Sequence, residues 1–198
     1  MRYDTYVCWE AYEAFLWFFI YPKRENLLCN IINMQNGSKI KNEKKRLEAV
    51  RSMNILDTEP EERFDVITKE AINFFHVPIS TISILDKDRE WFKSCQGLNA
   101  REGDRSISFC GHALLAEKIF IVEDTLKDLR FADNPHVTGE PHIRFYAGIA
   151  LHDPKTLLPV GVFCIKDYEP RKLTPQEISM FIDLGQRAED ELSKKSTN

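Results

Sequence analysis

The order of the hydrophobic patterns along the chain is the sequence feature that most restricts its fold. Apolar residues at helical spacing predict helices over residues 42–53, from Phe64 to Phe75 and from Ile178 to Leu192. Between the last two, runs rich in β-branched and aromatic residues predict strands at 79–85, 90–95, 119–122, 146–151 and 159–166. Because these strands do not alternate with helices, we predict an α+β domain with a largely antiparallel sheet.

Local signals mark where the helices begin. Thr58 with Glu61, and Thr174 with Glu177, have the spacing of capping boxes, and each threonine is followed within two residues by a proline. We therefore predict that two helices begin at these threonines. The charged run at 41–46 is predicted to be a solvated face of the first helix.

The middle of the chain is less regular. Residues 86–88 predict a turn that makes the first two strands a hairpin, and Gly97 and Gly103 are predicted to break the chain. A short helix is expected at 110–117. Residues 123–144 are rich in Asp, Asn, Gly and Pro and predict an ordered loop, and long loops inside compact domains are usually functional.

Length and composition restrict the function classes. A chain of 198 residues, 43% hydrophobic and 29% charged, suits one domain with a packed core. Its net charge of −4 argues against general nucleic-acid binding, which needs a basic surface. The five cysteines are widely spaced and form no C-x-x-C pair, which indicates free thiols in a reducing compartment. No segment resembles a secretory leader or a membrane-spanning helix, so we expect a cytoplasmic protein.

The start of the chain differs from the rest. Residues 1–33 are rich in aromatic side chains and contain no glycine. We predict that residues 1–40 are an N-terminal extension outside the fold and that the domain spans 41–195. A helix on a membrane surface would need a basic polar face, whereas this segment is acidic. Packing against the domain or against a dimer partner is a further alternative.

Several segments, taken in order, resemble GAF domains of bacterial signalling proteins. They are LDTEPEERFD at 56–65, VPIS at 77–80, DREWFKS at 88–94, SFCGHA at 108–113, GVFCIKD at 161–167 and RKLTPQE at 171–177. The most distinctive is RFADNPHVTGEPHIRFYAG at 130–148. The resemblance covers about residues 43–193.

This resemblance implies a fold and a function. The fold is a central antiparallel sheet of about six strands, with long N- and C-terminal helices on one face and a pocket, closed by the short helix and the long loop, on the other. The function is that of a sensory domain without catalysis, which binds a small molecule, forms a homodimer through its terminal helices and signals to a downstream protein. The characteristic motifs of cyclic-nucleotide-binding and bilin-binding members are not found, so no cofactor is predicted.

Candidate ligand-binding residues come from the segments expected to border that pocket. Arg144 suits bidentate recognition of a carboxylate or phosphate, but it would equally pin the loop by pairing with Asp133 or Glu140. Aromatic side chains supply apolar walls. The predicted set is Phe92, Phe109, Cys110, His112, Phe131, Asn134, Arg144, Tyr146 and Cys164.

Other interpretations stay open. Cys110 would be a reactive thiol if His112 lowered its pKa; the alternative is a small buried thiol beside a histidine bonded to the backbone. A thiol enzyme similar to free-methionine-sulfoxide reductase would use Cys95, Cys110 and Cys164. The two histidines of the long loop are too few to predict a metal site. A domain with a filled pocket would serve dimerisation alone.

Overall fold

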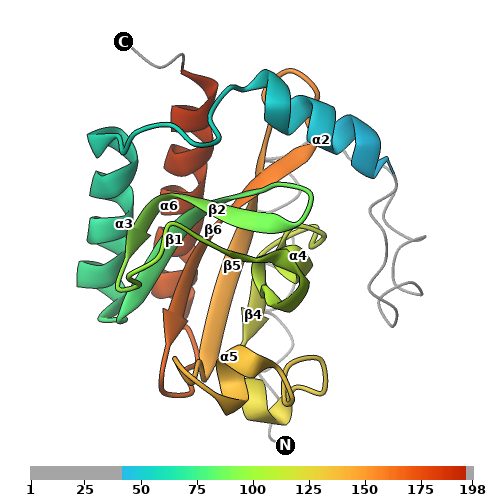
Figure 1. Cartoon of the computed structure of the whole chain (residues 1–198). Helices are drawn as coiled ribbons and strands as arrows, with labels where there is room; N and C mark the ends of the chain where they lie inside the picture. Colours follow the sequence, from blue (N-terminus) through green and yellow to red (C-terminus); the bar gives the residue numbers. More distant parts are fainter. Residues whose placement is uncertain (1–41, 195–198) are drawn as a thin grey trace, which may run out of the picture. The chain divides into compact units, whose positions relative to one another are not determined.

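The computed structural model describes residues 42–194 (Figure 1). The extension predicted for residues 1–40 lies outside the described residues. The helices are α2 (Glu43–Ser52), α3 (Glu62–Phe75), α4 (Cys110–Ala113), α5 (Pro135–Thr138) and α6 (Pro175–Ser193), and the 3-10 turns are η1 (Arg105–Ile107) and η2 (Thr125–Lys127). The strands are β1 (Ile79–Leu85), β2 (Arg89–Gln96), β3 (Glu102–Asp104), β4 (Phe120–Val122), β5 (Phe145–His152) and β6 (Pro159–Asp167). None of these helices is long and apolar enough to cross a membrane.

The six strands form one antiparallel sheet in the order β3-β2-β1-β6-β5-β4. This confirms the predicted α+β class, and the pairing of β1 with β2 confirms the predicted hairpin. β1 is buried along its whole length because it lies in the middle of the sheet. The first and last strands of the domain, β1 and β6, therefore pair with each other at its centre.

Two long helices, α3 and α6, pack on one face of the sheet, which we call the helical face (Figure 1). The ring of Phe181 in α6 lies 5.0 Å from that of Phe163 in β6 and 6.1 Å from that of Phe75 in α3. Each buried aromatic side chain stabilises the fold by about 1.5–3 kcal/mol relative to an exposed one. Trp91 belongs to this core, whereas its neighbour Phe92 points to the other face, as strand alternation predicts.

The start of α6 confirms the predicted capping box. Thr174 Oγ1 accepts a hydrogen bond from the backbone of Glu177, and the Glu177 carboxylate accepts one from the backbone of Thr174, with Pro175 in the first turn. Further along, α6 approaches β5 closely at Gly185, where an added Cβ would lie 2.5 Å from Ile149 Cγ2. The helix thus needs glycine at this point to lie flat on the sheet.

The capping box predicted for α3 is wrong. The N-cap is Glu61, and the Thr58 hydroxyl donates instead to the carbonyl of Ile55 at 2.7 Å. The reason is the buried ammonium of Lys93, which needs acceptors. It donates to Thr58 Oγ1 at 2.7 Å and forms an ion pair of 2.6 Å with Glu61. Both residues of the predicted cap therefore bind Lys93 instead of capping α3.

The short helix at 110–117 and the break at Gly103 also differ from prediction. The helix α4 ends at Ala113, because the backbone amides of Leu115 and Ala116 bond three residues back rather than four. Gly103 lies inside β3 and pairs with Glu90 of β2. The sequence had no run of β-forming residues to mark so short a strand.

The charged run at 41–46 is not wholly a solvated face. Lys44 and Lys45 are exposed, but Arg46 is buried and donates two hydrogen bonds to the Glu43 carboxylate, at 2.7 and 2.8 Å. Arg105 of η1 also donates to Glu43. Charge pairing thus lets an arginine of the first helix enter the interior.

Candidate functional site

The second face of the sheet carries polar side chains where the helical face carries apolar ones. Thr81 and Ser83 of β1, Cys164 of β6 and Tyr146 of β5 all point to this side, and all four are fully buried. The cover is made of short elements, since α4 contacts β1, β5 and β6. Figure 1 shows α4 and α5 on the side of the sheet opposite α3 and α6.

A group of thiols and hydroxyls lies beneath α4. The Sγ atoms of Cys110 and Cys164 are 3.9 Å apart, and the Tyr146 hydroxyl donates to Cys110 Sγ at 3.3 Å. Thr81 Oγ1 lies 3.1 Å from Cys164 Sγ, and Ser83 Oγ lies 3.9 Å from Cys110 Sγ. These five residues are called the thiol–hydroxyl cluster below.

The two thiols of this cluster differ in acidity. The hydrogen bond with Cys164, together with burial, raises the pKa of Cys110 well above its ordinary value. Burial also raises the pKa of Cys164, but the hydrogen bond from Cys110 and the charge of Lys166 outweigh it and bring that pKa down to about 7. Of the two thiols, Cys164 is therefore the more acidic.

A buried pair of opposite charges borders the cluster. Lys166 Nζ of β6 lies 4.0 Å from Glu90 Oε1 of β2, and both side chains are less than 10% exposed, at 8% and 7%. The Ser108 hydroxyl donates a short hydrogen bond to Glu90 and itself accepts one from the backbone of Cys110 at 3.0 Å. Burial raises the pKa of Glu90 to about 8, with the nearby Cys110 adding to the shift.

Aromatic rings close the cluster from above. The ring of Phe109 stacks on Phe131 at 4.6 Å and on Tyr146 at 5.2 Å. His112 lies against Phe131 at 4.8 Å, and burial with the nearby Arg130 lowers the pKa of its imidazole. The described contacts of this imidazole are with aromatic rings and with the charges of Arg130 and Asp128, not with the Cys110 thiol. The structure brings together Phe109, Cys110, Phe131, Tyr146 and Cys164 of the predicted set, with His112 at their margin.

Arg144 and Asn134, also in the predicted set, hold the loop in place. Arg144 pairs with Asp124 at 2.9 Å. The predicted pairing with Asp133 or Glu140 is therefore wrong. The backbone amide of Thr125 donates to the Arg144 carbonyl, and this brings the neighbouring Asp124 within reach of the Arg144 side chain. Asn134 caps α5 and donates to the carbonyl of Ile107 at 2.8 Å, which ties α5 to η1.

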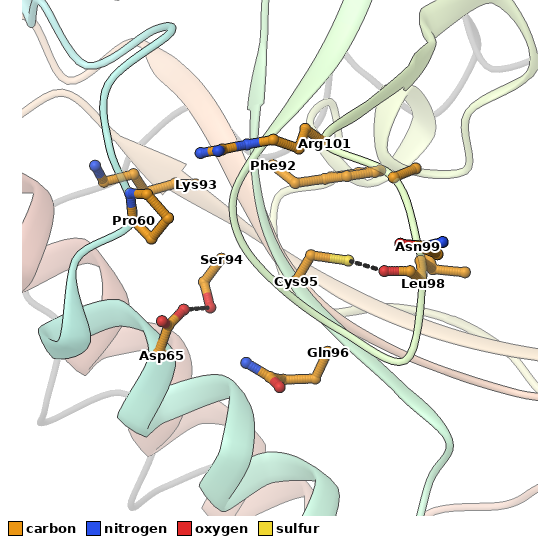
Figure 2. Close-up of a pocket in the computed structure, with 11 residues that line it drawn as sticks. Pro60, Asp65, Phe92, Lys93, Ser94, Cys95, Gln96, Leu98, Asn99 and Arg101 are labelled. Atoms are coloured by element: carbon orange, nitrogen blue, oxygen red, sulfur yellow. Dashed lines mark hydrogen bonds between the residues drawn. The ribbon is translucent and has the colours of Figure 1, made fainter.

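An open groove lies beside the part of β2 that extends beyond its pairing with β3 (Figure 2). Its volume is about 450 Å³. Figure 2 shows two hydrogen bonds beside the groove. The Cys95 thiol donates to the carbonyl of Leu98 on one side, and the Ser94 hydroxyl donates to the Asp65 carboxylate on the other. The lining residues are Pro60, Asp65, Phe92, Lys93, Ser94, Cys95, Gln96, Leu98, Asn99, Ala100 and Arg101. Of the predicted set, Phe92 reaches this groove.

Sequence reasoning missed the charged residues of the second face. Glu90 and Lys166 stand at the ends of predicted strands, where charges are usually solvated. Strand alternation could have placed both residues on the second face. Lys166 lies two residues after Cys164, and Glu90 lies two residues before Phe92, so each shares a face with a predicted site residue. Within residues 42–194, no group of three or more His, Cys, Asp and Glu is placed to hold a metal ion.

These features define a class of protein: an α+β domain whose antiparallel sheet has long helices on one face and a covered polar interior on the other. The sequence model of the GAF domain matches residues 59–192, and the chain belongs to the GAF domain family. It is 41% identical over 139 residues to a cyclic di-GMP phosphodiesterase of Pseudomonas aeruginosa. That match covers 70% of this chain but 24% of the phosphodiesterase, so the chain spans about a quarter of that relative's length.

Solved structures share the fold. The GAF domain of an Acinetobacter phosphoenolpyruvate-protein phosphotransferase has a TM-score of 0.56 at 19% identity, covering 75% of this chain and 93% of its own. A domain of a putative two-component sensor histidine kinase from Sinorhizobium meliloti has a TM-score of 0.55 at 16% identity, over 71% and 95%. A free methionine-R-sulfoxide reductase from Thermoplasma acidophilum has a TM-score of 0.53 at 10% identity, over 76% and 96%. These structures show that the chain shares their fold.

Proposed function

We propose that this GAF domain is a regulatory module without catalysis, which binds a small molecule on the second face of its sheet and passes the change to a signalling partner. The name of the Pseudomonas aeruginosa relative supports a role in signalling. The ligand would lie beneath α4 and α5, beside the thiol–hydroxyl cluster.

The observation that carries this proposal is the polar interior of the second face. A face that served packing alone would be filled with apolar side chains, because buried polar groups cost free energy unless they are fully bonded. Here a lysine and a glutamate are buried beside the five residues of the thiol–hydroxyl cluster. Such groups provide the directional contacts by which a site recognises a ligand.

The cover of this face is suited to respond to a ligand. α4 and α5 have four residues each, and η1 and η2 have three, so their conformation depends on tertiary contacts rather than on helical hydrogen bonds. A ligand that prefers one arrangement of this cover shifts the population by its difference in affinity alone, tenfold for each ~1.4 kcal/mol.

Hydrogen exchange on the whole chain tests the proposal. The chain is mixed with the low-molecular-weight fraction of a bacterial extract, and the same buffer without this fraction serves as the control. We expect slower exchange in residues 105–144 with the fraction, while α3 and α6 stay unchanged. Equal exchange with and without the fraction, or protection confined to α3 and α6, would contradict the proposal.

A thiol oxidoreductase is the second candidate, favoured by the distance of 3.9 Å between Cys110 Sγ and Cys164 Sγ. Both sulfur atoms are fully buried, however, which hinders a substrate. We expect no reduction of free methionine-R-sulfoxide with dithiothreitol as reductant. Turnover that Cys110→Ser abolishes would establish the enzyme in place of the sensor.

Pairing of two copies and a cytoplasmic setting complete the proposal. Val66 and Phe74 of α3 and Ile182 of α6 are exposed apolar residues on the terminal helices, which supports a homodimer. Cys95, Cys110 and Cys164 are free thiols, which supports a reducing compartment. Light scattering of the chain and of the Phe74→Asp variant tests the pairing: we expect a dimer that the variant weakens.

A further inference from the structure

Two thiols that lie far apart in the sequence meet on the second face of the sheet. Cys110 is the first residue of α4, and Cys164 lies in β6, 54 positions later. Their Sγ atoms are 3.9 Å apart, and both side chains are fully buried. The third described thiol, Cys95, lines the groove instead and donates to the carbonyl of Leu98. Cys110 and Cys164 are therefore the described thiols that are placed to react with each other.

The distance between these two sulfur atoms is short enough for small side-chain rotations to bring them into a covalent bond. A disulfide bond is about 2.05 Å long, so each sulfur has to move by about 1 Å. α4 contacts β6 directly, which keeps the two backbone segments close together. Because α4 has four residues, its position adjusts more easily than that of a long helix.

The polar surroundings of the pair favour oxidation that begins at Cys164. The thiolate is the reactive form of a cysteine, and hydrogen bonds to the sulfur stabilise it in a buried place. Cys164 Sγ accepts from the Cys110 thiol and lies 3.1 Å from the Thr81 hydroxyl. It is also the more acidic of the two thiols. Cys110, which holds its proton toward Cys164, is then placed to react second.

We propose that Cys110 and Cys164 form a modification site, at which a peroxide produces a disulfide bond that fastens α4 onto β6. Cys164 Sγ attacks one oxygen of hydrogen peroxide and the O–O bond breaks; Cys164 becomes a sulfenic acid, and its thiol proton leaves with the other oxygen as water. Cys110 Sγ then attacks Cys164 Sγ. The S–S bond forms, the S–O bond breaks, and the proton of Cys110 leaves with the hydroxyl group as a second water. The two thiols thus lose two electrons, which reduce the peroxide to water.

The burial of the pair selects a small oxidant. Hydrogen peroxide has two heavy atoms, so it needs a smaller opening of the cover than an amino-acid sulfoxide does. The end of α4 allows such an opening, because the amides of Leu115 and Ala116 bond three residues back and short elements open locally at little cost. In a reducing compartment the bond would be transient, as redox-sensing disulfides are. The inference goes beyond the proposed function, since the oxidation needs no ligand.

Peroxide treatment of the whole reduced chain, followed by peptide mass spectrometry, tests the proposal. Thiols that stay free are alkylated with iodoacetamide after unfolding. Trypsin then separates the three cysteines, because residues 94–101, 106–118 and 156–166 form peptides with one cysteine each. We expect the last two peptides to be joined and two hydrogen atoms lighter than their sum, with Cys95 alkylated. Alkylated Cys110 and Cys164 after a large excess of peroxide, or a bond from either to another cysteine, overturns the proposal.

The fastening of α4 has a physical effect of its own. The bond closes a loop whose ends are 54 positions apart, and a disulfide across a loop of that length should raise the melting temperature by about 5–15 °C. Hydrogen exchange in residues 105–144 should become slower without any added ligand, and dithiothreitol should restore both thiols and the original melting temperature. A bond that forms but leaves the melting temperature and the exchange unchanged would overturn the fastening of α4.

Three variants assign the effect to the pair. Cys110→Ser and Cys164→Ser each remove one sulfur and are expected to lose both the joined peptides and the rise in melting temperature. Cys95→Ser is the matched control and should keep both. Circular dichroism before oxidation checks that each variant is folded, and alanine replaces serine where it is not. A rise that persists in the Cys110 variant contradicts the proposal.

The results also separate this inference from the proposed function. If the disulfide forms while the bacterial extract gives no protection, the modification site stands and the ligand-binding function fails. If the extract protects residues 105–144 but peroxide joins no peptides, the ligand-binding function stands and the modification site fails.

Discussion

Replacement of Lys166 by methionine is expected to make the domain more stable at mildly acidic pH. At about pH 6, Glu90, with its pKa of about 8, is protonated, so the ion pair at 4.0 Å contributes little. The variant then avoids the cost of desolvating the Lys166 ammonium, whose side chain is 8% exposed. Exchange of buried charged groups for apolar ones of similar volume is often neutral or stabilising by about 1–4 kcal/mol. We expect about 1–2 kcal/mol, or a rise of roughly 2–8 °C in melting temperature for a domain of this size.

The gain should disappear as the pH rises. An acid whose pKa is raised in the folded state binds more protons folded than unfolded, so Glu90 costs stability as pH rises from its ordinary 4.5 to about 8. Without Lys166 the pKa of Glu90 rises further, and the loss continues above pH 8 at up to about 1.4 kcal/mol per pH unit. Above that pH the variant should therefore become less stable than the parent.

Equilibrium unfolding in urea, followed by circular dichroism at several pH values, measures both effects. Lys172→Met, at an exposed position, is the matched control and should stay within about 0.5 kcal/mol of the parent. The double change Lys166→Met with Glu90→Gln should keep its gain at every pH. A loss of more than about 1 kcal/mol for Lys166→Met at pH 6 would refute the reasoning, because the ammonium would then be well bonded in the folded state.

Two further outcomes are expected. Gly97→Ala should cost more than about 3 kcal/mol in urea unfolding, because Gly97 has a φ of +85° and an added Cβ would lie 1.9 Å from the Pro78 carbonyl oxygen. Gly111→Ala, where the added Cβ meets its nearest atom at 3.8 Å, is the control and should change stability by less than about 1 kcal/mol. Thr174→Ala should lower the stability by about 1 kcal/mol through loss of the cap of α6, and an unchanged melting temperature would contradict that role.

Features set by neighbouring residues could be predicted from the sequence. The hairpin of β1 and β2 follows from two β-forming runs and a polar turn, and the cap of α6 follows from Thr174 and Glu177 alone. The capping box at Thr58 has the same spacing but fails, because Lys93, 35 positions later, takes both of its polar groups. Sequence spacing does not show which distant cation will compete for a cap.

The thiols and the tyrosine of the candidate site could also be predicted from local sequence, but its buried charges could not. Cys110, Tyr146 and Cys164 could be placed together because each lies on a segment expected to border the second face. The burial of Lys166 and Glu90 could not be predicted, since it depends on how α4 and the 105–144 segment dock onto the sheet. A charge at a strand end is solvated in most sheets, and only the docked cover makes it an interior group.

The strand order β3-β2-β1-β6-β5-β4 has a consequence for how the chain folds during synthesis. β1 can pair with β2 as soon as β2 has been synthesised. Its other edge stays unpaired until β6, which ends at Asp167, has been synthesised. Until about eighty further residues have left the ribosome, at roughly 5–20 residues per second, the apolar strand Ile79–Leu85 presents an open edge for several seconds. Pairing of the first strand with the last also makes for a slow folding step, because distant segments must meet before the centre of the sheet exists. A nascent chain stopped before β6 would thus be prone to aggregate. Pairing with β6 covers the open edge of β1 and removes this risk.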